Sequence, residues 1–343
     1  MKSGLQGAPS TSKNPAFSLS SNEAFLSWRL SEAESKSDSL NDSSESLNES
    51  SFDQSESLDP TTVLNESSAS NIFTHGFVGQ FHPMRHSATD RSEITLLQNH
   101  RITREAQAWI ERGYGLHRLG NYEEAIVCFD TALELSSQLA DAWQGKGICL
   151  GEMNESDGAI GCFEQVILIN PDNYRGWHNR GKALMRVGRQ EEAIGCFKRV
   201  LHLKPENYKA WYNRGLCLDH LRHLEQALHS FDQALSLKPD CYYAWSGRGN
   251  TLTKMHRFEE AVFAFDRSID LRSHNFPAWY GKATCYAAAR QTLPAIGSLS
   301  QAMAYAPQNV RNMAKEDSAF THIRHEAAFQ ALFVPVEPIS VLH

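Results

Sequence analysis

Six tryptophans recur at a constant interval of 34 residues, and this spacing constrains the fold more than any other feature of the chain. They are Trp109, Trp143, Trp177, Trp211, Trp245 and Trp279. If each repeat begins three residues before its tryptophan, six units follow one another without an insertion: 106–139, 140–173, 174–207, 208–241, 242–275 and 276–309. A repeat of this length predicts a linear array in which each supersecondary unit packs against its neighbours.

Other places of the unit also repeat, and together they predict a helix hairpin. The eighth place is glycine in five units, the twentieth is alanine in all six, and the twenty-fourth is phenylalanine in five. Places four, eight and eleven lie near one face of a first helix, and places twenty, twenty-four and twenty-seven form a stripe on a second. The small residues should let the two helices approach closely. Proline stands at place thirty-two of four units and should end the second helix.

This pattern resembles the tetratricopeptide repeat family, whose 34-residue unit carries Trp, Gly, Ala, Phe and Pro at these places. The resemblance covers residues 106–309 and implies an all-α fold, a right-handed superhelix (α-solenoid) of six helix hairpins over residues 96–309. In segment 314–333 apolar residues stand at helical intervals, so residues 310–343 are expected to form a capping helix and a C-terminal tail. The cap also resembles that of bacterial, notably cyanobacterial, multi-repeat proteins of this family. The apolar residues are Phe320, Ile323, Phe329 and Leu332.

Residues 1–95 differ in composition from the repeats. Residues 1–70 contain eleven Asp and Glu against four Lys and Arg, which gives the same net charge of −7 as the whole chain. Between residues 31 and 70 there are 14 serines but only six Leu, Ile, Val and Phe, too little apolar surface to offset the entropy of ordering the backbone. The sequence therefore predicts a disordered, serine-rich acidic tail and linker over 1–95. Serines beside acidic residues are candidates for phosphorylation.

The resemblance also implies where a partner binds. In the family, places two, five, nine, twelve and thirteen of the first helices project from the concave face. The middle units place basic and aromatic residues there, which predicts a groove for an extended protein segment that is acidic or contains an aromatic residue. An ordinary solvated helix face is the alternative. The acidic tail is a candidate for intramolecular docking in the groove. The proposed partner-binding residues are Arg175, His178, Lys182, Arg186, Lys209, Tyr212 and Tyr243.

The seventh place departs from the family because it is basic in all six units. We expect the aliphatic stems to pack along the helix while the charged heads reach water or flanking acids. The alternative is a basic ladder that binds the phosphates of a nucleic acid. Residues 71–343 have no net charge, which makes nucleic acid an unlikely partner. The six residues are Arg112, Lys146, Arg180, Arg214, Arg248 and Lys282.

No sequence feature predicts catalysis or a cofactor. The chain has no glycine-rich phosphate loop, nucleophile elbow or paired carboxylates in a plausible cleft. Six of the seven cysteines fall at places ten and twenty-three, where they should pack rather than react, and no Cys-x-x-Cys motif occurs. The pairs His82/His86 and His220/His223 have no converging acidic or cysteine partners, so no metal site is expected.

The prediction is therefore a non-catalytic scaffold or adaptor for protein–protein interactions. A nucleic-acid-binding protein and a regulatory subunit of an enzyme encoded elsewhere are the alternatives. No apolar run is long enough to span a bilayer, so we expect no membrane insertion and a cytoplasmic location.

Overall fold

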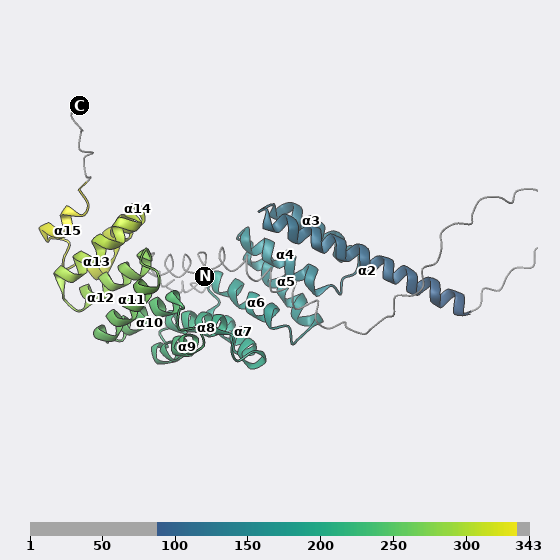
Figure 1. Cartoon of the computed structure of the whole chain (residues 1–343), viewed down its shortest axis with the longest axis horizontal. Coiled ribbons are helices and arrows are strands. Elements are labelled where there is room, and N and C mark those ends of the chain that lie inside the picture. The colour runs from purple at the N-terminus through teal and green to yellow at the C-terminus, as the bar shows by residue number, and fades with distance from the viewer. Residues whose placement is uncertain (1–87, 335–343) are drawn as a thin grey trace, which may run out of the picture. The chain divides into compact units, whose positions relative to one another are not determined.

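The computed structural model describes residues 88–334, with side chains from residue 98 onward. Every regular element in this range is a helix, which confirms the all-α prediction (Figure 1). The described residues fall into two compact units, 88–173 and 174–334, and each is treated by itself. The predicted tail over 1–87 and the last residues, 335–343, lie outside the described residues.

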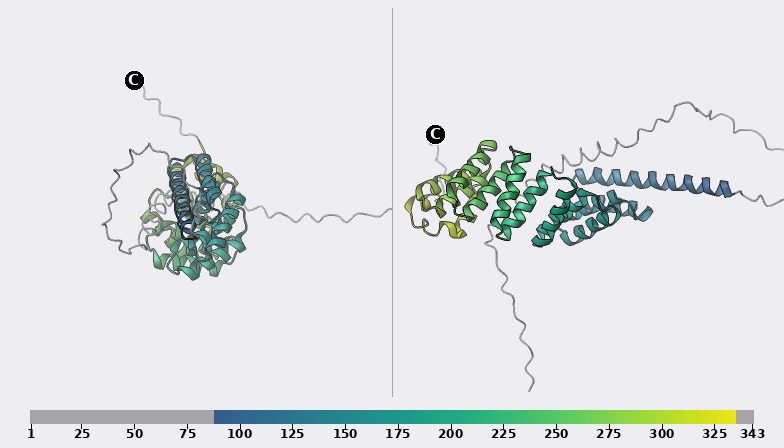
Figure 2. Two further views of the ribbon diagram at one scale, coloured as in Figure 1. Left: turned by 90° about the vertical axis from the view of Figure 1, so that its right-hand side faces the viewer. Right: turned by 90° about the horizontal axis from the view of Figure 1, so that it is seen from below.

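The first unit contains two helix hairpins. Helix α2 (Ala88–Arg118) pairs with α3 (Tyr122–Leu135), and α4 (Ala140–Glu152) pairs with α5 (Ser156–Ile169). Helix α2 begins earlier than the predicted boundary at residue 96, and Figures 1 and 2 show that it extends well beyond the helices beside it. Its described residues before the first repeat, 98–105, are all exposed.

The second unit contains four hairpins and a cap. The hairpins are α6 (Tyr174–Arg186) with α7 (Gln190–Leu203), α8 (Tyr208–His220) with α9 (Leu224–Leu237), α10 (Tyr242–Lys254) with α11 (Phe258–Leu271), and α12 (Phe276–Ala288) with α13 (Thr292–Tyr305). Each first helix contacts the next first helix, and each second helix packs against the first helix that follows it. The six predicted hairpins are thus all present. The right-handed superhelix stays a prediction.

The phenylalanine of each hairpin explains the glycine pattern. Phe197, Phe231 and Phe265 are fully buried. A Cβ atom added to Gly249, at place eight, would lie 2.9 Å from the ring of Phe265 in the same hairpin. One added to Gly281, at place six of the next hairpin, would lie 2.5 Å from that ring. Both distances are too short for a real side chain, so the ring fills the space between two hairpins only because glycine leaves it free.

The tryptophans link consecutive hairpins. All six are half-buried. In four of them the indole Nε1–H donates a hydrogen bond to the carbonyl of place thirty-two in the preceding unit, whether that residue is serine or proline. The bonds join Trp143 to Ser137, Trp211 to Pro205, Trp245 to Pro239 and Trp279 to Ser273, at N···O distances of 2.9–3.0 Å.

The turn inside each hairpin has the same backbone conformation. Place fifteen has a positive φ angle in all six units, which places it in the left-handed region that glycine favours. Two units have glycine there, and the other four carry a larger residue with a φ between 59° and 64°. The six residues are Gly120, Asn154, Gly188, Arg222, His256 and Arg290.

The cap covers the last hairpin as predicted but is not one continuous helix. It consists of α14 (Pro307–Glu316), a 3₁₀ turn η1 (Ser318–Phe320) and α15 (Ala327–Ala331). Phe320, Ile323 and Phe329 are buried against α12 and α13. Helix α14 ends at Asp317, whose carboxylate accepts hydrogen bonds from the Ala319 N–H (2.9 Å) and from the Tyr280 hydroxyl (2.7 Å). These bonds hold the backbone in a turn between α14 and the rest of the cap.

Candidate protein-binding face of the second unit

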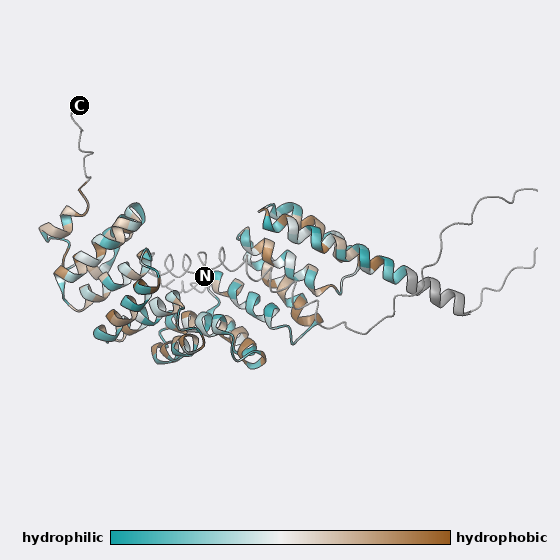
Figure 3. Cartoon of the chain, viewed as in Figure 1, coloured by the Kyte–Doolittle hydropathy of each residue, from teal (hydrophilic) through white to brown (hydrophobic). Residues whose placement is uncertain are grey.

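Charge is divided unequally between the two helices of each hairpin in the second unit. The first helices, α6, α8, α10 and α12, carry nine Lys and Arg and a single Asp. The second helices, α7, α9, α11 and α13, carry eight Asp and Glu but only three Lys and Arg. Figure 3 shows polar and apolar residues on both kinds of helix, so it is the sign of the charge that separates them.

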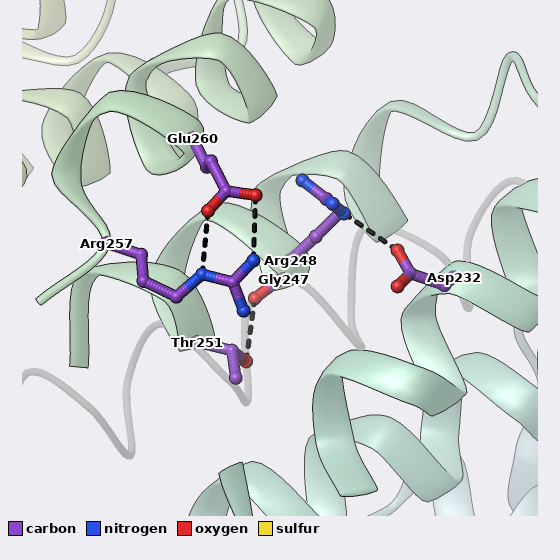
Figure 4. Close-up of polar contacts among 6 residues, drawn as sticks. All are labelled: Asp232, Gly247, Arg248, Thr251, Arg257 and Glu260. Atoms are coloured by element: carbon purple, nitrogen blue, oxygen red, sulfur yellow. Dashed lines mark hydrogen bonds and ion pairs between the residues drawn. The ribbon is translucent and has the colours of Figure 1, made fainter. Parts of the chain in front are cut away.

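The seventh-place bases are directed toward the second helices. Lys146 contacts Asp130 at 2.6 Å, Arg248 contacts Asp232 at 2.8 Å, and Lys282 contacts Asp266. Each aspartate is at place twenty-five of the preceding hairpin, and Figure 4 shows the Arg248–Asp232 pair. The same bases lie over the tryptophan three residues earlier, with 5.9 Å from Arg248 to the ring centre of Trp245. Pairing and stacking occupy these heads, which weakens the interpretation as a ladder for nucleic-acid phosphates.

Four other bases on α6 and α8 form what we call the basic face: Arg175, Lys182, Arg186 and Lys209. All four are half-buried, so their stems are packed and part of each side chain remains accessible. The single acid of the first helices does not neutralise them. Asp219 accepts hydrogen bonds from Lys254 (2.7 Å) and Thr251 (2.9 Å) on α10.

His178 lies next to the basic face and is neutral. Its Nε2 is 3.2 Å from the side-chain amide of Asn213, which donates to the unprotonated ring nitrogen, and its ring meets Phe197 edge-on at 5.7 Å. Burial, together with the nearby charges of Lys182 and Lys209, lowers the pKa of His178 to about 3. The structure thus brings together three of the predicted site residues.

The prediction for Tyr212 needs correction. Its side chain is only 1% exposed and packs against Phe231 and Tyr243, so a partner cannot reach it. Ile110, Ser246 and Tyr280, at place five of other units, are also buried, whereas Gln144 and His178 are half-buried. In four of the six units place five therefore faces neighbouring helices rather than the concave surface.

Tyr243 and Arg175 are half-buried at the edge of the face. The Tyr243 ring meets Tyr212 at 4.7 Å and Tyr242 at 5.3 Å, so it adds an aromatic surface beside the lysines. Arg175 is turned along its own helix, where its Nε donates to the Tyr174 hydroxyl at 3.3 Å.

A repeated clasp was missed by sequence reasoning. In three hairpins the tyrosine at place one lies against the Lys or Arg at place thirty-one, with 4.8–4.9 Å from the charge to the ring centre. The signal was present as an aromatic residue and a base separated by 30 positions. The pairs are Tyr174 with Lys204, Tyr208 with Lys238, and Tyr242 with Arg272.

The cysteines fill the core, as predicted. All seven are buried free thiols. Burial raises the pKa of Cys149 to about 12 and that of Cys162 to about 11, so neither supplies a thiolate at neutral pH. Among the residues with described side chains, no group of three or more His, Cys, Asp or Glu is placed to hold a metal ion. None of the helices in the described part of the chain is both long and apolar enough to cross a membrane.

Comparison with known families matches three of the units just described. Models of the tetratricopeptide repeat match residues 106–139, 174–207 and 208–241, with the boundaries that the tryptophan spacing predicts. The chain is a tetratricopeptide repeat protein. A model of the protein prenyltransferase alpha subunit repeat matches residues 156–187, a range of sequence that contains the second helix of one repeat and the first helix of the next. Tetratricopeptide repeat proteins generally mediate protein–protein interactions and are typically non-catalytic, so protein partners are implied.

Solved structures show the same repeat fold. PilF of Pseudomonas aeruginosa is 21% identical over 63% of this chain and 99% of its own, with a TM-score of 0.54. Cut9, in the Cut9–Hcn1 hetero-tetramer of APC/C, is 18% identical over 67% of this chain and 46% of its own, also with a TM-score of 0.54. At these identities the likeness concerns the fold alone. No curated protein matches this tetratricopeptide repeat protein in sequence.

Proposed function

We propose that this tetratricopeptide repeat protein is a non-catalytic scaffold whose basic face binds an extended acidic segment of a partner protein. The observation that carries the proposal is the unequal charge of the hairpins. Nine bases and one acid lie on the first helices of the second unit, and Asp219 is already paired with Lys254. Arg175, Lys182, Arg186 and Lys209 are four of these nine bases and lie on the neighbouring helices α6 and α8.

The environment of His178 supports this proposal. Lys182 and Lys209 belong to different helices, and after burial their charges are the main causes that lower the pKa of His178, so both lie near this ring. Two like charges in proximity favour an anion between them. A carboxylate of a bound segment would form charge-assisted hydrogen bonds with both lysines, and Tyr243 would offer a ring face to an apolar or aromatic neighbour.

A binding experiment with charge-reversal variants tests the proposal. The probe is a fluorescein-labelled peptide of residues 43–58 of this chain, which contains four acidic residues and Phe52. Its anisotropy is measured against protein that lacks residues 1–70. We expect saturable binding that weakens with salt, and at least a tenfold weaker affinity for Lys182→Glu/Lys209→Glu, because two attractions become repulsions.

A matched control separates this face from the general charge of the molecule. Arg267→Glu/Lys315→Glu changes the net charge by the same amount at exposed positions of the same unit, on α11 and α14. We expect it to retain most of the affinity. Equal losses in the two variants would show that the probe responds to net charge, and unchanged affinity in the first variant would refute the basic face.

A further inference from the structure

The seventh-place bases follow a rule to which Arg214 is the exception. Each of the other five has an acidic residue at place twenty-five of the preceding hairpin or at place nineteen of its own. Arg248 has both, because it pairs with Asp232 and Glu260 stands at place nineteen, where Arg257 is the main partner of that carboxylate. Arg180 also has both by its place in the sequence, Glu164 and Glu192. The remaining acids are Asp130 for Lys146, Asp266 for Lys282 and, by its place in the sequence, Glu124 for Arg112.

Arg214 lacks both of these acids. Place twenty-five of the preceding hairpin is Lys198, and place nineteen of its own hairpin is Gln226. The Nε of Arg214 is buried and has no hydrogen-bond partner among the described residues. Burial is the sole cause that lowers its pKa, with no contribution from an acid. A buried group of this kind requires an explanation, because leaving it unpaired costs stability.

Stacking on tryptophan does not explain the exception. The Arg214 guanidinium lies 5.3 Å from the ring centre of Trp211. Arg248 makes the same contact with Trp245, at 5.9 Å, and still keeps its acidic partner. The cation–π contact is therefore compatible with an aspartate at place twenty-five. It does not explain why Lys198 stands at that place before Arg214.

The next pair of hairpins shows the geometry of the places that are equivalent to Lys198 and Arg214, namely Asp232 and Arg248. Between α9 and α11, over α10, there is an open hollow of about 460 Å³. Figure 4 shows two ion pairs at this hollow, Arg248 with Asp232 and Arg257 with Glu260. Its floor is Trp245, which Phe263 meets edge-on at 6.2 Å.

The equivalent places between α7 and α9 repeat this arrangement with the opposite charge. Trp211 forms the floor, and His229 meets it edge-on at 6.1 Å, as Phe263 meets Trp245. Lys198 replaces Asp232, Gln226 replaces Glu260, and Glu225 stands at the place of Glu259. Lys198, Gln226 and His229 are exposed. We call these residues, with Trp211 and Arg214, the cationic furrow.

We propose that the cationic furrow binds a phosphoryl group carried by a side chain of a partner protein, such as a phosphoserine. In the hollow between α9 and α11 three acids accompany one base, whereas here the two cations Lys198 and Arg214 accompany a single acid, Glu225, at the place of Glu259. A phosphoryl group carries a charge of about −1.5 to −2 at pH 7 and matches both. The forked guanidinium of Arg214 suits two phosphoryl oxygens, and Lys198 supplies a point charge.

The neighbouring furrow limits the ligand to one group. Asp232, Glu259 and Glu260 line the hollow between α9 and α11, so a continuous polyanion would be repelled one hairpin further along. This favours a single phosphorylated side chain over a nucleic acid. The furrow lies between the second helices and does not share a residue with the basic face, so this proposal stands independently of that face.

The test follows the tryptophan indole resonances of the full-length, ¹⁵N-labelled protein during titration with O-phospho-L-serine at constant ionic strength. The Trp211 signal is assigned with Trp211→Phe. We expect a saturable shift of this signal with phosphoserine and little change with serine. Inorganic phosphate should bind as well, whereas aspartate, with a single carboxylate on its side chain, should bind at least about tenfold more weakly. Equal responses to phosphoserine and aspartate would contradict the dianion argument.

Three variants locate the site. Arg214→Gln should weaken phosphoserine binding at least tenfold. Lys198→Asp restores the acid seen in the other hairpins, so it should abolish binding and also raise the thermal midpoint. Arg248→Gln, in the acidic furrow, is the matched control and should leave the titration unchanged. If Lys198→Asp changes neither the midpoint nor the titration, the proposal is wrong.

A competition experiment excludes the nucleic-acid alternative. Single-stranded poly(U) should displace phosphoserine no better than expected for one phosphate group. The affinity for poly(U) is measured against salt concentration, and its slope gives the number of counterions released. Release of more than about two ions would instead indicate nucleic-acid binding and would overturn the proposal.

Discussion

The ring of His178 is kept neutral by its surroundings, and this makes stability depend on pH. The folded-state pKa of about 3 lies below the ordinary value of 6.5, so the unfolded chain binds a proton that the folded chain rejects. The stability that this adds is complete above about pH 6.5 and is lost as the pH falls toward 3, at about 1.4 kcal/mol per pH unit. We expect wild-type protein to lose about 2 kcal/mol more than His178→Gln between pH 6.5 and pH 5.

Urea unfolding at the two pH values measures this difference. Glutamine retains an acceptor for the Asn213 amide but does not titrate. His202, which is exposed on α7, is the control position. Between the two pH values the free energy of unfolding of His202→Gln should fall by as much as that of wild type. Equal pH dependence in wild type and His178→Gln would show that the ring is not enclosed as the structure has it.

At the scale of helices, the sequence could predict the hairpins because their contacts repeat in register. Alanine, glycine and phenylalanine recur every 34 residues, and in five repeats the phenylalanine packs against the glycine at place eight of its own hairpin. The pairing of bases with acids could also have been found, since Asp232 and Arg248 are separated by 16 positions, as are Asp130 and Lys146. It was missed because that spacing matches no helix period and acquires meaning only once the faces that meet are known.

The candidate site was harder to predict for the same reason. Lys182 and Lys209 are both half-buried and both lie near His178, and their role in binding stays a prediction. The prediction for Tyr212 was wrong, because a tyrosine at place five is compatible with a groove or with a core. Only its packing against the neighbouring Phe231 and Tyr243 shows that it belongs to the core. Burial at a given place depends on the residues of the next repeat, which a family pattern does not specify.

The cap depends on one polar contact that can be removed without changing its shape. The Tyr280 hydroxyl donates to Asp317 at 2.7 Å, and burial with this carboxylate raises the pKa of Tyr280. Tyr280→Phe should lower the free energy of unfolding by about 1.5–3 kcal/mol, the usual range for a hydrogen bond to a charged group. Urea unfolding followed by circular dichroism provides the measurement.

A second tyrosine in the same cluster is the control. Tyr286 packs against the core of the cap, and Tyr286→Phe should change stability by much less than Tyr280→Phe. If the two variants are equally stable, the Tyr280–Asp317 bond does not hold the cap.

Over the whole chain, acidic and neutral segments are separated: residues 1–70 carry −7, and residues 71–343 carry no net charge. The structure does not describe the tail, so its role is inferred from charge alone. The peptide of residues 43–58 is the probe for the basic face, and the full chain carries the same sequence covalently attached. A linked copy competes at an effective concentration that reaches about 1 mM. Any affinity tighter than that would let the tail occupy the face in place of a partner.

This competition predicts a difference between two lengths of the protein. If the probe binds protein lacking residues 1–70 with a Kd of about 0.1 mM, the full chain should bind it about tenfold more weakly at low salt. The difference should shrink as salt screens the charges, and it should disappear in Lys182→Glu/Lys209→Glu, because that variant binds neither copy. Equal affinities of the two lengths at low salt would mean that the tail does not reach the basic face, and its acidity would then serve the solubility of the chain rather than its regulation.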